Sequence, residues 1–497
     1  MDIRNSIKNI ISNPVGFLLH NSGIKQTIAK NTFWLALAEG ITRFLKLFLI
    51  IYVARILGVT EYGKFTFALA FVTLFAIFSD FGISEITIRE FAREKEKEKE
   101  FPFLLSLKIL LGIGTLFLIL IVSFFITLDP VIRGIIWILG IYTIITSFSS
   151  IIYAFFQARQ KMEYKAWGSI IQAIAATGAG FFVLFNFPSV KNLSLSYLFA
   201  SLIALIFILF LFNFKIYKLK LSFNKKIWQN YLAISWPLAL IGVFSAIYNQ
   251  TDSIMMGYWG QITETGWYNA AYKIMGVTLI PAGLIGASFY PVLSKLFKES
   301  KEKLQNAWNY YMDATIFLTI PLVIGGIALA PRIIDFVYDP RYNPSILAFQ
   351  ILIITGGIMI LSNPFNTTLV IWNYQRKVFW VVLSGAIVNV VLNLILIPQY
   401  SLYGAAFTTL ITVFLIFFLS LRLTLKLTSI KPLNWKSFLT FINSLIASIP
   451  MYFVIIRPSV YNANVFLSVF LGIITYGIFF FIFKTIIGKL KLCKNSI

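Results

Sequence analysis

Residues 103–126 read Phe103-Leu-Leu-Ser-Leu-Lys108-Ile-Leu-Leu-Gly-Ile-Gly-Thr-Leu-Phe-Leu-Ile-Leu-Ile-Val-Ser-Phe-Phe-Ile126, and this stretch decides the fold class. Lys108 is its one ionisable residue, and its length exceeds the roughly 20 apolar residues that a helix needs to cross a bilayer. We therefore expect an all-α integral membrane protein of the cytoplasmic membrane. About 14 such spans are predicted, at 33–57, 64–88, 103–126, 131–156, 167–187, 193–214, 231–256, 267–293, 307–330, 345–370, 377–397, 402–424, 436–456 and 463–486.

The composition excludes several other classes of protein. Of 497 residues 59% are hydrophobic and 12% charged, which is more apolar side chain than a water-soluble protein buries. The connections between the spans are too short for an external catalytic domain, so we expect no enzyme and no cofactor. The single cysteine, Cys493, and the single histidine, His20, exclude a disulfide framework and a metal site built from these residues.

The basic residues indicate which way the chain faces. With the N-terminus in the cytoplasm, 31 of the 42 lysines and arginines fall at cytoplasmic ends and 6 fall outside. This asymmetry is what the positive-inside rule predicts for an even number of helices with both termini cytoplasmic. The net charge of +23 therefore reflects topology and contact with membrane lipids, and we expect no nucleic-acid partner.

A short motif occurs twice, which predicts two related halves. Glu61-x-Gly-x-Phe-x-x-Ala68 returns 203 residues later as Glu264-x-Gly-x-Tyr-x-x-Ala271, each copy near the start of a helix. An offset of six spans keeps the orientation, so the copies indicate parallel repeats, the usual basis of alternating access. The predicted parts are an interfacial segment 1–32, an N-lobe 33–214, a basic linker 215–230, a C-lobe 231–424 and two appended helices with a basic tail, 425–497.

Charged residues at membrane depth are costly unless paired or hydrated, so they are functional candidates. In the first span Glu39, Arg43 and Lys46 are spaced by four and three residues and share one face of a helix. Such a cationic stripe on a helix that lines a cleft would bind a phosphate or diphosphate. A structural ion pair between Glu39 and Arg43 is the alternative.

Most of the other charged residues within the predicted spans have two possible roles. Arg55 guards the outer mouth or snorkels, while Asp252 and Lys273 form a salt bridge or take part in gating or ion coupling. Asp80 and Glu85 either serve a function or pair with Arg89 or the first helix. We expect Lys108 and Asp313 to reach water at the cytoplasmic ends of their helices. The polar pairs Asn389/Asn393 and Asn363/Asn366 are expected to join helices by hydrogen bonds.

Several stretches resemble the polysaccharide transporters of the multidrug/oligosaccharidyl-lipid/polysaccharide superfamily, which includes O-antigen-type flippases. They are Ala54-Arg55-Ile-Leu-Gly-Val-Thr-Glu-Tyr-Gly63, Ser79-Asp80-Phe-Gly-Ile83, Thr251-Asp252 with Gly266-Trp-Tyr268 and Lys273, and Val388-Asn389-Val-Val-Leu-Asn393 with Gly404-Ala-Ala406. The resemblance implies a V-shaped pair of six-helix lobes around a cavity that holds the diphosphate of a polyprenyl-linked glycan. It also implies cations on the first and eighth helices, here Arg43, Lys46, Arg55 and Lys273.

These observations predict a flippase that moves a polyprenyl-(di)phosphate-linked oligosaccharide across the membrane by alternating access. Arg43, Lys46, Arg55 and Lys273 are the expected substrate-binding residues, and Glu39, Asp80 and Asp252 the expected coupling or gating residues. The expected partners are the lipid-linked glycan, membrane lipids and a coupling ion, H⁺ or Na⁺, for a monomeric protein. The alternatives are a multidrug or cation extruder of the same superfamily and, less favoured, a membrane-embedded glycan polymerase or ligase.

Overall fold

The computed structural model describes residues 21, 23–215, 220–432, 435–461 and 464–494. Within these ranges the chain forms helices joined by short connections, and no strand occurs. Most of the predicted interfacial segment and His20 lie outside the described residues, as does the side chain of Cys493. Contacts divide the chain into two compact units, Met1–Gln250 and Thr251–Ile497, which are described separately below.

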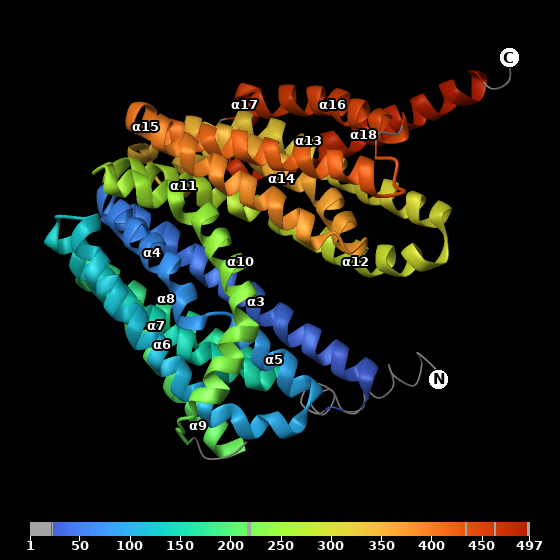
Figure 1. The fold of residues 1–497 in the computed structure, drawn as a ribbon. Helices are drawn as coiled ribbons and strands as arrows, with labels where there is room; N and C mark the ends of the chain where they lie inside the picture. Colours follow the sequence, from blue (N-terminus) through green and yellow to red (C-terminus); the bar gives the residue numbers. More distant parts are fainter. Residues whose placement is uncertain (1–20, 22, 216–219, 433–434, 462–463, 495–497) are drawn as a thin grey trace, which may run out of the picture. The chain divides into compact units, whose positions relative to one another are not determined.

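The first unit contains helices from the blue to the green part of Figure 1. They are α3 (Ile24–Leu57), α4 (Val59–Asp80), α5 (Ile83–Arg93), η1 (Lys95–Glu100), α6 (Phe101–Ile126), α7 (Pro130–Ala158), α8 (Met162–Asn186), α9 (Val190–Lys215) and most of α10 (Lys225–Tyr258). Phenylalanines from four of these helices, Phe91, Phe101, Phe155 and Phe212, form one cluster with ring centroids 4.7–6.2 Å apart. Close packing of this kind holds membrane helices together where lipid is as apolar as the side chains.

The second unit starts within α10 and contains the remaining helices. They are α11 (Ile262–Thr278), α12 (Ile280–Glu299), α13 (Lys301–Val337), η2 (Pro340–Tyr342), α14 (Ser345–Ile371), α15 (Gln375–Leu427), α16 (Trp435–Ile456), α17 (Pro458–Tyr461) and α18 (Val465–Lys494). Pro321 and Pro364 lie inside α13 and α14, and Pro281 follows the break between α11 and α12. Prolines thus lie inside two of these helices and directly after the break between two others, where they bend or interrupt a helix.

The helices agree with the predicted number of membrane spans. Twelve helices in the described ranges are long and apolar enough to cross a bilayer. One of them, α15, has 53 residues and a non-helical Ser401 (φ 51°), so it contains the two predicted spans 377–397 and 402–424. The charged helix α3, with 34 residues, precedes the twelve. The chain is an all-helical, multi-pass protein of the cell membrane.

Both copies of the repeated motif have the same local structure. Each follows a glycine with positive φ, Gly58 (80°) or Gly260 (75°), and each places its glutamate in the first turn of a helix, α4 or α11. Ala68 and Ala271 are both fully buried. The local folding of the two copies supports the interpretation of the motif as a repeat.

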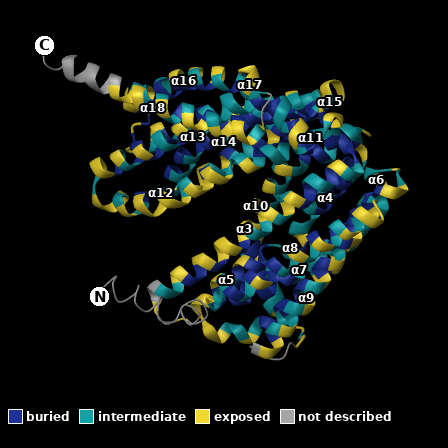
Figure 2. Cartoon of the chain, turned by 180° about the vertical axis from the view of Figure 1, so that it is seen from behind, coloured by how far each residue is buried: buried dark blue, intermediate teal, exposed yellow. Residues whose placement is uncertain are grey.

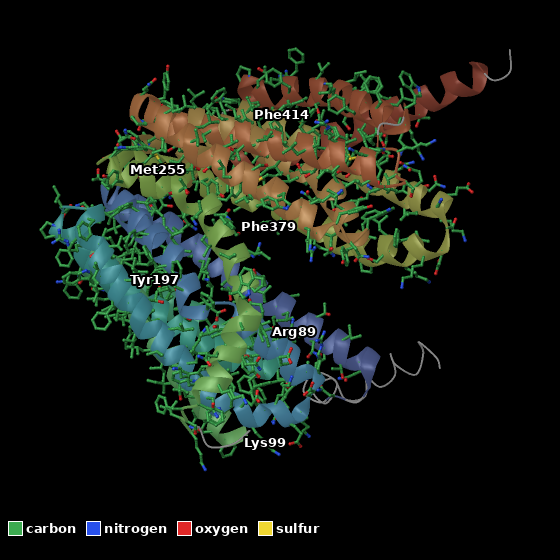
Figure 3. The ribbon with its side chains drawn as sticks, in the orientation of Figure 1. Arg89, Lys99, Tyr197, Met255, Phe379 and Phe414 are labelled. Carbon is green, nitrogen blue, oxygen red and sulfur yellow. The ribbon has the colours of Figure 1, made fainter. Side chains whose placement is uncertain are left out.

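The charged run 93–100 forms contacts with distant parts of the chain. Glu98 accepts hydrogen bonds from Arg159, and Glu100 accepts one from the Tyr231 hydroxyl at 2.7 Å. Trp228 also donates to the Phe103 carbonyl at 2.8 Å. Arg89 and Lys99 mark this end of the first unit in Figure 3. The bonds of Tyr231 and Trp228 fix the start of α10 to η1 and α6, and the sequence did not indicate them because the partners lie 125 to 131 residues apart.

Candidate functional site

The charged stripe of α3 forms as its spacing predicts. Arg43 Nε donates to Glu39 Oε1 at 2.6 Å, four residues apart on one helix face. Both side chains are more than half exposed, at 58% and 63%, so the pair adds little to stability. Lys46 is exposed on the same helix. Figure 2 shows that α3 keeps a long exposed face, on which these charges lie.

A pocket of about 580 Å³ lies along this face, between α3 and α8. Glu39 and Lys46 line it from α3, and Lys165 and Gln172 line it from α8. Tyr142 of α7 and Tyr197 of α9 complete the wall, and Tyr197 is labelled among the helices of the first unit in Figure 3. We call this space the α3–α8 pocket. Its volume lies in the range of small-molecule sites.

Contacts at two positions along their length, one near the start and one near the end of each helix, align α3 with α8. The buried Lys30 Nζ lies 2.9 Å from Glu163 Oε2, and Asn31 donates to the Gln160 side chain at 2.8 Å. At the other level Leu49 packs against Gly180, where a Cβ would lie 2.7 Å from Leu49 Cδ1. The two helices therefore run parallel, with the pocket between these levels.

The pocket carries more positive than negative charge. Lys46 and Lys165 line it with one carboxylate, Glu39, which interacts electrostatically with both; Lys165 also interacts with Glu85, which does not line the pocket. Arg43 is not among the lining residues, although it pairs with Glu39, which is. An excess of cations in a pocket that also contains hydroxyl and amide groups is suited to an anionic ligand.

The remaining predicted substrate residues lie elsewhere. Arg55 is exposed in the last turn of α3, and Lys273 is half-buried on α11 in the second unit. The structure thus brings Glu39 and Lys46 into one pocket and leaves Arg55 at the end of the helix. Their roles in binding stay predictions.

Asp80, whose side chain is 24% exposed, forms an ion pair with the buried Lys108 that the sequence did not identify. Lys108, 2% exposed, contacts the Asp80 carboxylate, which also accepts hydrogen bonds from Ser84 and Ser150. The expectation that Lys108 reaches water was wrong, because α6 presents this residue to α4. Arg89 pairs with Glu90 at 2.9 Å, so the pairing of Asp80 with Arg89 was also wrong. Asp313 is half-buried, and its Oδ1 has no hydrogen-bond partner in the described ranges.

The turn after Asp80 explains why glycine follows at position 82. Phe81 and Gly82 have positive φ, 51° and 74°. A Cβ on Gly82 would lie 2.9 Å from Leu238 Cβ and 3.1 Å from the Ser235 carbonyl of α10. The Asp80-Phe-Gly82 signature therefore joins an ion pair to a close approach between a turn and α10.

Asp252 lies at the centre of a buried polar cluster in the second unit. It accepts hydrogen bonds from Asn393 Nδ2 at 2.6 Å, from Thr409 Oγ1 at 2.9 Å and from the Tyr268 hydroxyl. Asn393 also donates to Asn389 at 3.2 Å. We call these five residues the Asp252 cluster. The expectation of bonds between helices is confirmed for Asn393, which bonds Asp252 of α10, and for Asn366 of α14, which accepts from the Ser420 hydroxyl of α15 at 2.9 Å; the bond between Asn389 and Asn393 stays within α15.

Sequence reasoning missed several lining residues of the α3–α8 pocket. Lys165 was counted as part of a cytoplasmic connection, whereas it lies in the first turn of α8. The pattern of lining residues on α8, Lys165, Ser169, Gln172, Ala176, has the helical spacing of three and four and could have identified this face.

Comparisons with known proteins agree with this architecture. Residues 28–297, more than half of the chain, match the family model described as polysaccharide biosynthesis protein. The capsular polysaccharide biosynthesis protein CapF of Staphylococcus aureus is 24% identical over 47% of this chain and 60% of its own length. The probable low-salt glycan biosynthesis flippase Agl15 of Haloferax volcanii is 22% identical over 48% of this chain and 50% of its own length. The chain thus spans about half to three fifths of these two relatives.

Solved structures share the fold. The lipid II flippase MurJ in an inward closed conformation aligns with a TM-score of 0.74 at 18% identity, over 91% of this chain and 99% of that one. An inward-facing multidrug resistance MATE family transporter aligns at 0.61 and 14% identity, over 79% and 99%. At these identities the alignments show a common fold alone. Together with the family match, they establish that the chain belongs to the polysaccharide biosynthesis protein family of multi-pass membrane proteins, with the fold of the superfamily that its sequence resembles.

Proposed function

We propose that the protein is a flippase, which moves a polyprenyl-diphosphate-linked glycan across the cytoplasmic membrane without making or breaking a bond. The observation that carries this proposal is the α3–α8 pocket, in which Lys46 and Lys165 outnumber Glu39. Lysine ammonium groups bind phosphate oxygens through charge-assisted hydrogen bonds. The names of the relatives CapF and Agl15 and of the structural neighbour MurJ support a glycan-bearing lipid as the cargo.

In the proposed cycle the phosphates bind Lys46, with Arg43 one turn away on α3; a role for Arg55 and Lys273 is expected from the sequence alone. The polyprenyl tail stays in lipid, since an apolar chain gains nothing from leaving it. The two repeats then move as largely rigid bodies and expose the site on the other side of the membrane. Transfer of an anion is worth about 2.3 kcal/mol per charge per 100 mV, so a membrane potential would drive or oppose the step.

Reconstitution of the purified protein tests this function. Proteoliposomes that contain a fluorescent polyprenyl-diphospho-sugar should show protein-dependent exposure of the probe on the opposite leaflet. The recovered lipid should be chemically unchanged. Cleavage or elongation of the glycan in the absence of translocation would instead support a polymerase or ligase.

Extrusion of cationic compounds is the second candidate, because the fold is shared with a MATE transporter. The pocket's charge opposes it, since a cation would meet two lysines and one carboxylate. Uptake of a cationic dye into proteoliposomes under the same conditions separates the two. The flippase proposal expects no dye movement at concentrations where the lipid probe is moved.

We further propose that the Asp252 cluster couples transport to a cation. Carboxylate, amide and hydroxyl oxygens, the groups it gathers, are the ligands that hard cations prefer. Asn393 Oδ1 is buried and has no hydrogen-bond partner among the described residues, which leaves an acceptor oxygen available. The position 203 residues before Asp252 is Leu49, so the first repeat lacks the equivalent carboxylate.

A variant at Asp252 tests the coupling. Flipping by the unaltered protein should respond to an imposed Na⁺ or H⁺ gradient and not to a K⁺ gradient of equal size. Asp252→Asn keeps the shape of the side chain and removes its charge, so this response should vanish. A variant that flips slowly but retains the full ion response would contradict a coupling role for Asp252.

A further inference from the structure

The α3–α8 pocket contains neutral polar groups that phosphate binding does not require. Thr42, Ser169, Gln172, Thr177 and Tyr197 all line it. None of these side chains makes a hydrogen bond within the described part of the chain, and Thr42 Oγ1 is a buried atom without a partner. Thr177 and Tyr197 are 8% and 9% exposed. Buried polar groups left unpaired are costly, so this arrangement indicates a polar occupant.

The hydroxyls of the pocket differ from other serine and threonine hydroxyls in the first unit. Serine and threonine in a membrane helix usually satisfy themselves by donating to the carbonyl three or four residues earlier. Thr143 of α7 does so at 2.8 Å, Thr115 of α6 at 2.7 Å and Ser194 of α9 at 2.9 Å. Thr42, Ser169 and Thr177 make no such bond, and all three belong to one pocket.

Small residues make the space that these groups surround. Six alanines line the pocket, from α3, α8 and α9: Ala36, Ala38, Ala166, Ala173, Ala176 and Ala200. Tyr142 and Tyr197 form one wall, with ring centroids 5.8 Å apart and planes at 79°. The face of an aromatic ring, open volume and several neutral donors and acceptors suit a sugar ring that carries many hydroxyls.

The pocket's polarity distinguishes it from the other large cavity. In the second unit a space of about 520 Å³ is lined almost wholly by apolar side chains of α11, α13, α14, α16 and α18. An apolar occupant would leave the hydroxyls and the amide of the α3–α8 pocket unpaired. A polyprenyl tail is therefore the wrong chemistry for it.

We infer that the α3–α8 pocket is a sugar subsite, which binds the glycan residue attached directly to the diphosphate. This inference rests on the proposed flippase function and adds to it the recognition of the sugar. Gln172, Thr42, Ser169 and Thr177 bond its hydroxyls, and Tyr142 and Tyr197 pack against its ring. Lys165 acts beside Lys46 as a second phosphate-binding cation, one not anticipated from the sequence.

The test compares binding of undecaprenyl diphosphate with binding of the same lipid carrying one sugar, either glucose, galactose, N-acetylglucosamine or N-acetylgalactosamine. Affinities are measured on the purified full chain in detergent. The unaltered protein should bind at least one of the sugar-bearing lipids more tightly than the bare diphosphate. Gln172→Ala and Thr177→Val should each lower that preference by about three- to tenfold, the effect of one or two lost hydrogen bonds, and leave diphosphate binding unchanged.

Matched variants separate recognition from folding and from phosphate binding. Thr143→Val removes a buried hydroxyl of the first unit outside the pocket and should leave the sugar preference intact. Lys46→Ala and Lys165→Ala should weaken both kinds of lipid together. An unaltered protein without preference for any sugar, or a preference that survives Gln172→Ala and Thr177→Val, would overturn the subsite. Failure of the unaltered protein to bind any diphosphate lipid would instead count against the proposed function itself.

Discussion

At the scale of single residues, we expect Lys46 and Arg43, two of the predicted cations of α3, to contribute differently to binding. Lys46 lines the α3–α8 pocket, whereas Arg43 pairs with Glu39 and does not line it. Lys46→Ala should therefore weaken binding of a polyprenyl diphosphate by roughly ten- to a hundredfold, the value of a lost hydrogen bond to a charged group. Arg43→Ala should weaken it less. An equal loss of affinity in both variants would show that lining the pocket does not make Lys46 more important than Arg43 for binding.

The pair of Asp80 with the buried Lys108 should matter for stability. Removal of one partner leaves an uncompensated charge inside the protein, a cost of about 3–5 kcal/mol. We expect Asp80→Ala and Lys108→Ala each to lower the unfolding temperature in detergent strongly, and the double variant to lose much less than the sum. The exposed pair Lys99–Glu96 is the control, since water screens it and its loss should leave the unfolding temperature nearly unchanged. Additive losses for Asp80 and Lys108 would contradict the pairing.

At the scale of elements, Gly404 is required by the bend of α15. A Cβ at this position would lie 2.4 Å from the Leu396 carbonyl oxygen and 3.2 Å from the Ile397 nitrogen, which are backbone atoms that cannot rotate away. Gly404→Ala should therefore destabilise the protein or abolish its folding. Gly114→Ala in α6, where a Cβ would meet nothing within 4 Å, should be neutral or stabilising by about 0.5–1 kcal/mol. Thermal unfolding of the two variants side by side checks the difference, and equal midpoints would contradict it.

The alignment of α3 with α8 is the second feature at this scale. Lys30 and Glu163 are both nearly inaccessible, and their pair sets the level at which the helices meet. Because the pocket's two lysines lie on different helices, a shift of α3 against α8 would change their separation. Glu163→Gln should thus reduce both stability and diphosphate binding, although this residue does not line the pocket. If Glu163→Gln bound diphosphate as tightly as an equal amount of folded unaltered protein, the alignment of α3 with α8 would not depend on this pair.

At the scale of the whole molecule, hydropathy and charge distribution predicted the fold class and the spans well. Long apolar runs can hardly be anything but membrane helices, and the break at Ser401 falls between the predicted spans 377–397 and 402–424. The pairing of Lys108 with Asp80 was missed because periodicity does not tell which face of an almost wholly apolar helix meets a neighbour. The neutral polar residues of the pocket could not be predicted from the sequence either. Thr42 and Thr177 resemble any threonine of a membrane helix until their hydrogen bonds are known.

The flippase proposal requires that cations of α3 hold the phosphates of a lipid-linked glycan during translocation. The decisive measurement is the initial rate at which the unaltered protein, Lys46→Arg and Lys46→Ala flip a fluorescent polyprenyl-diphospho-sugar in proteoliposomes. We expect protein-dependent flipping that Lys46→Arg largely retains and Lys46→Ala loses by tenfold or more at equal amounts of folded protein. Flipping by Lys46→Ala at the unaltered rate, or no flipping by any of the three, would contradict the claim.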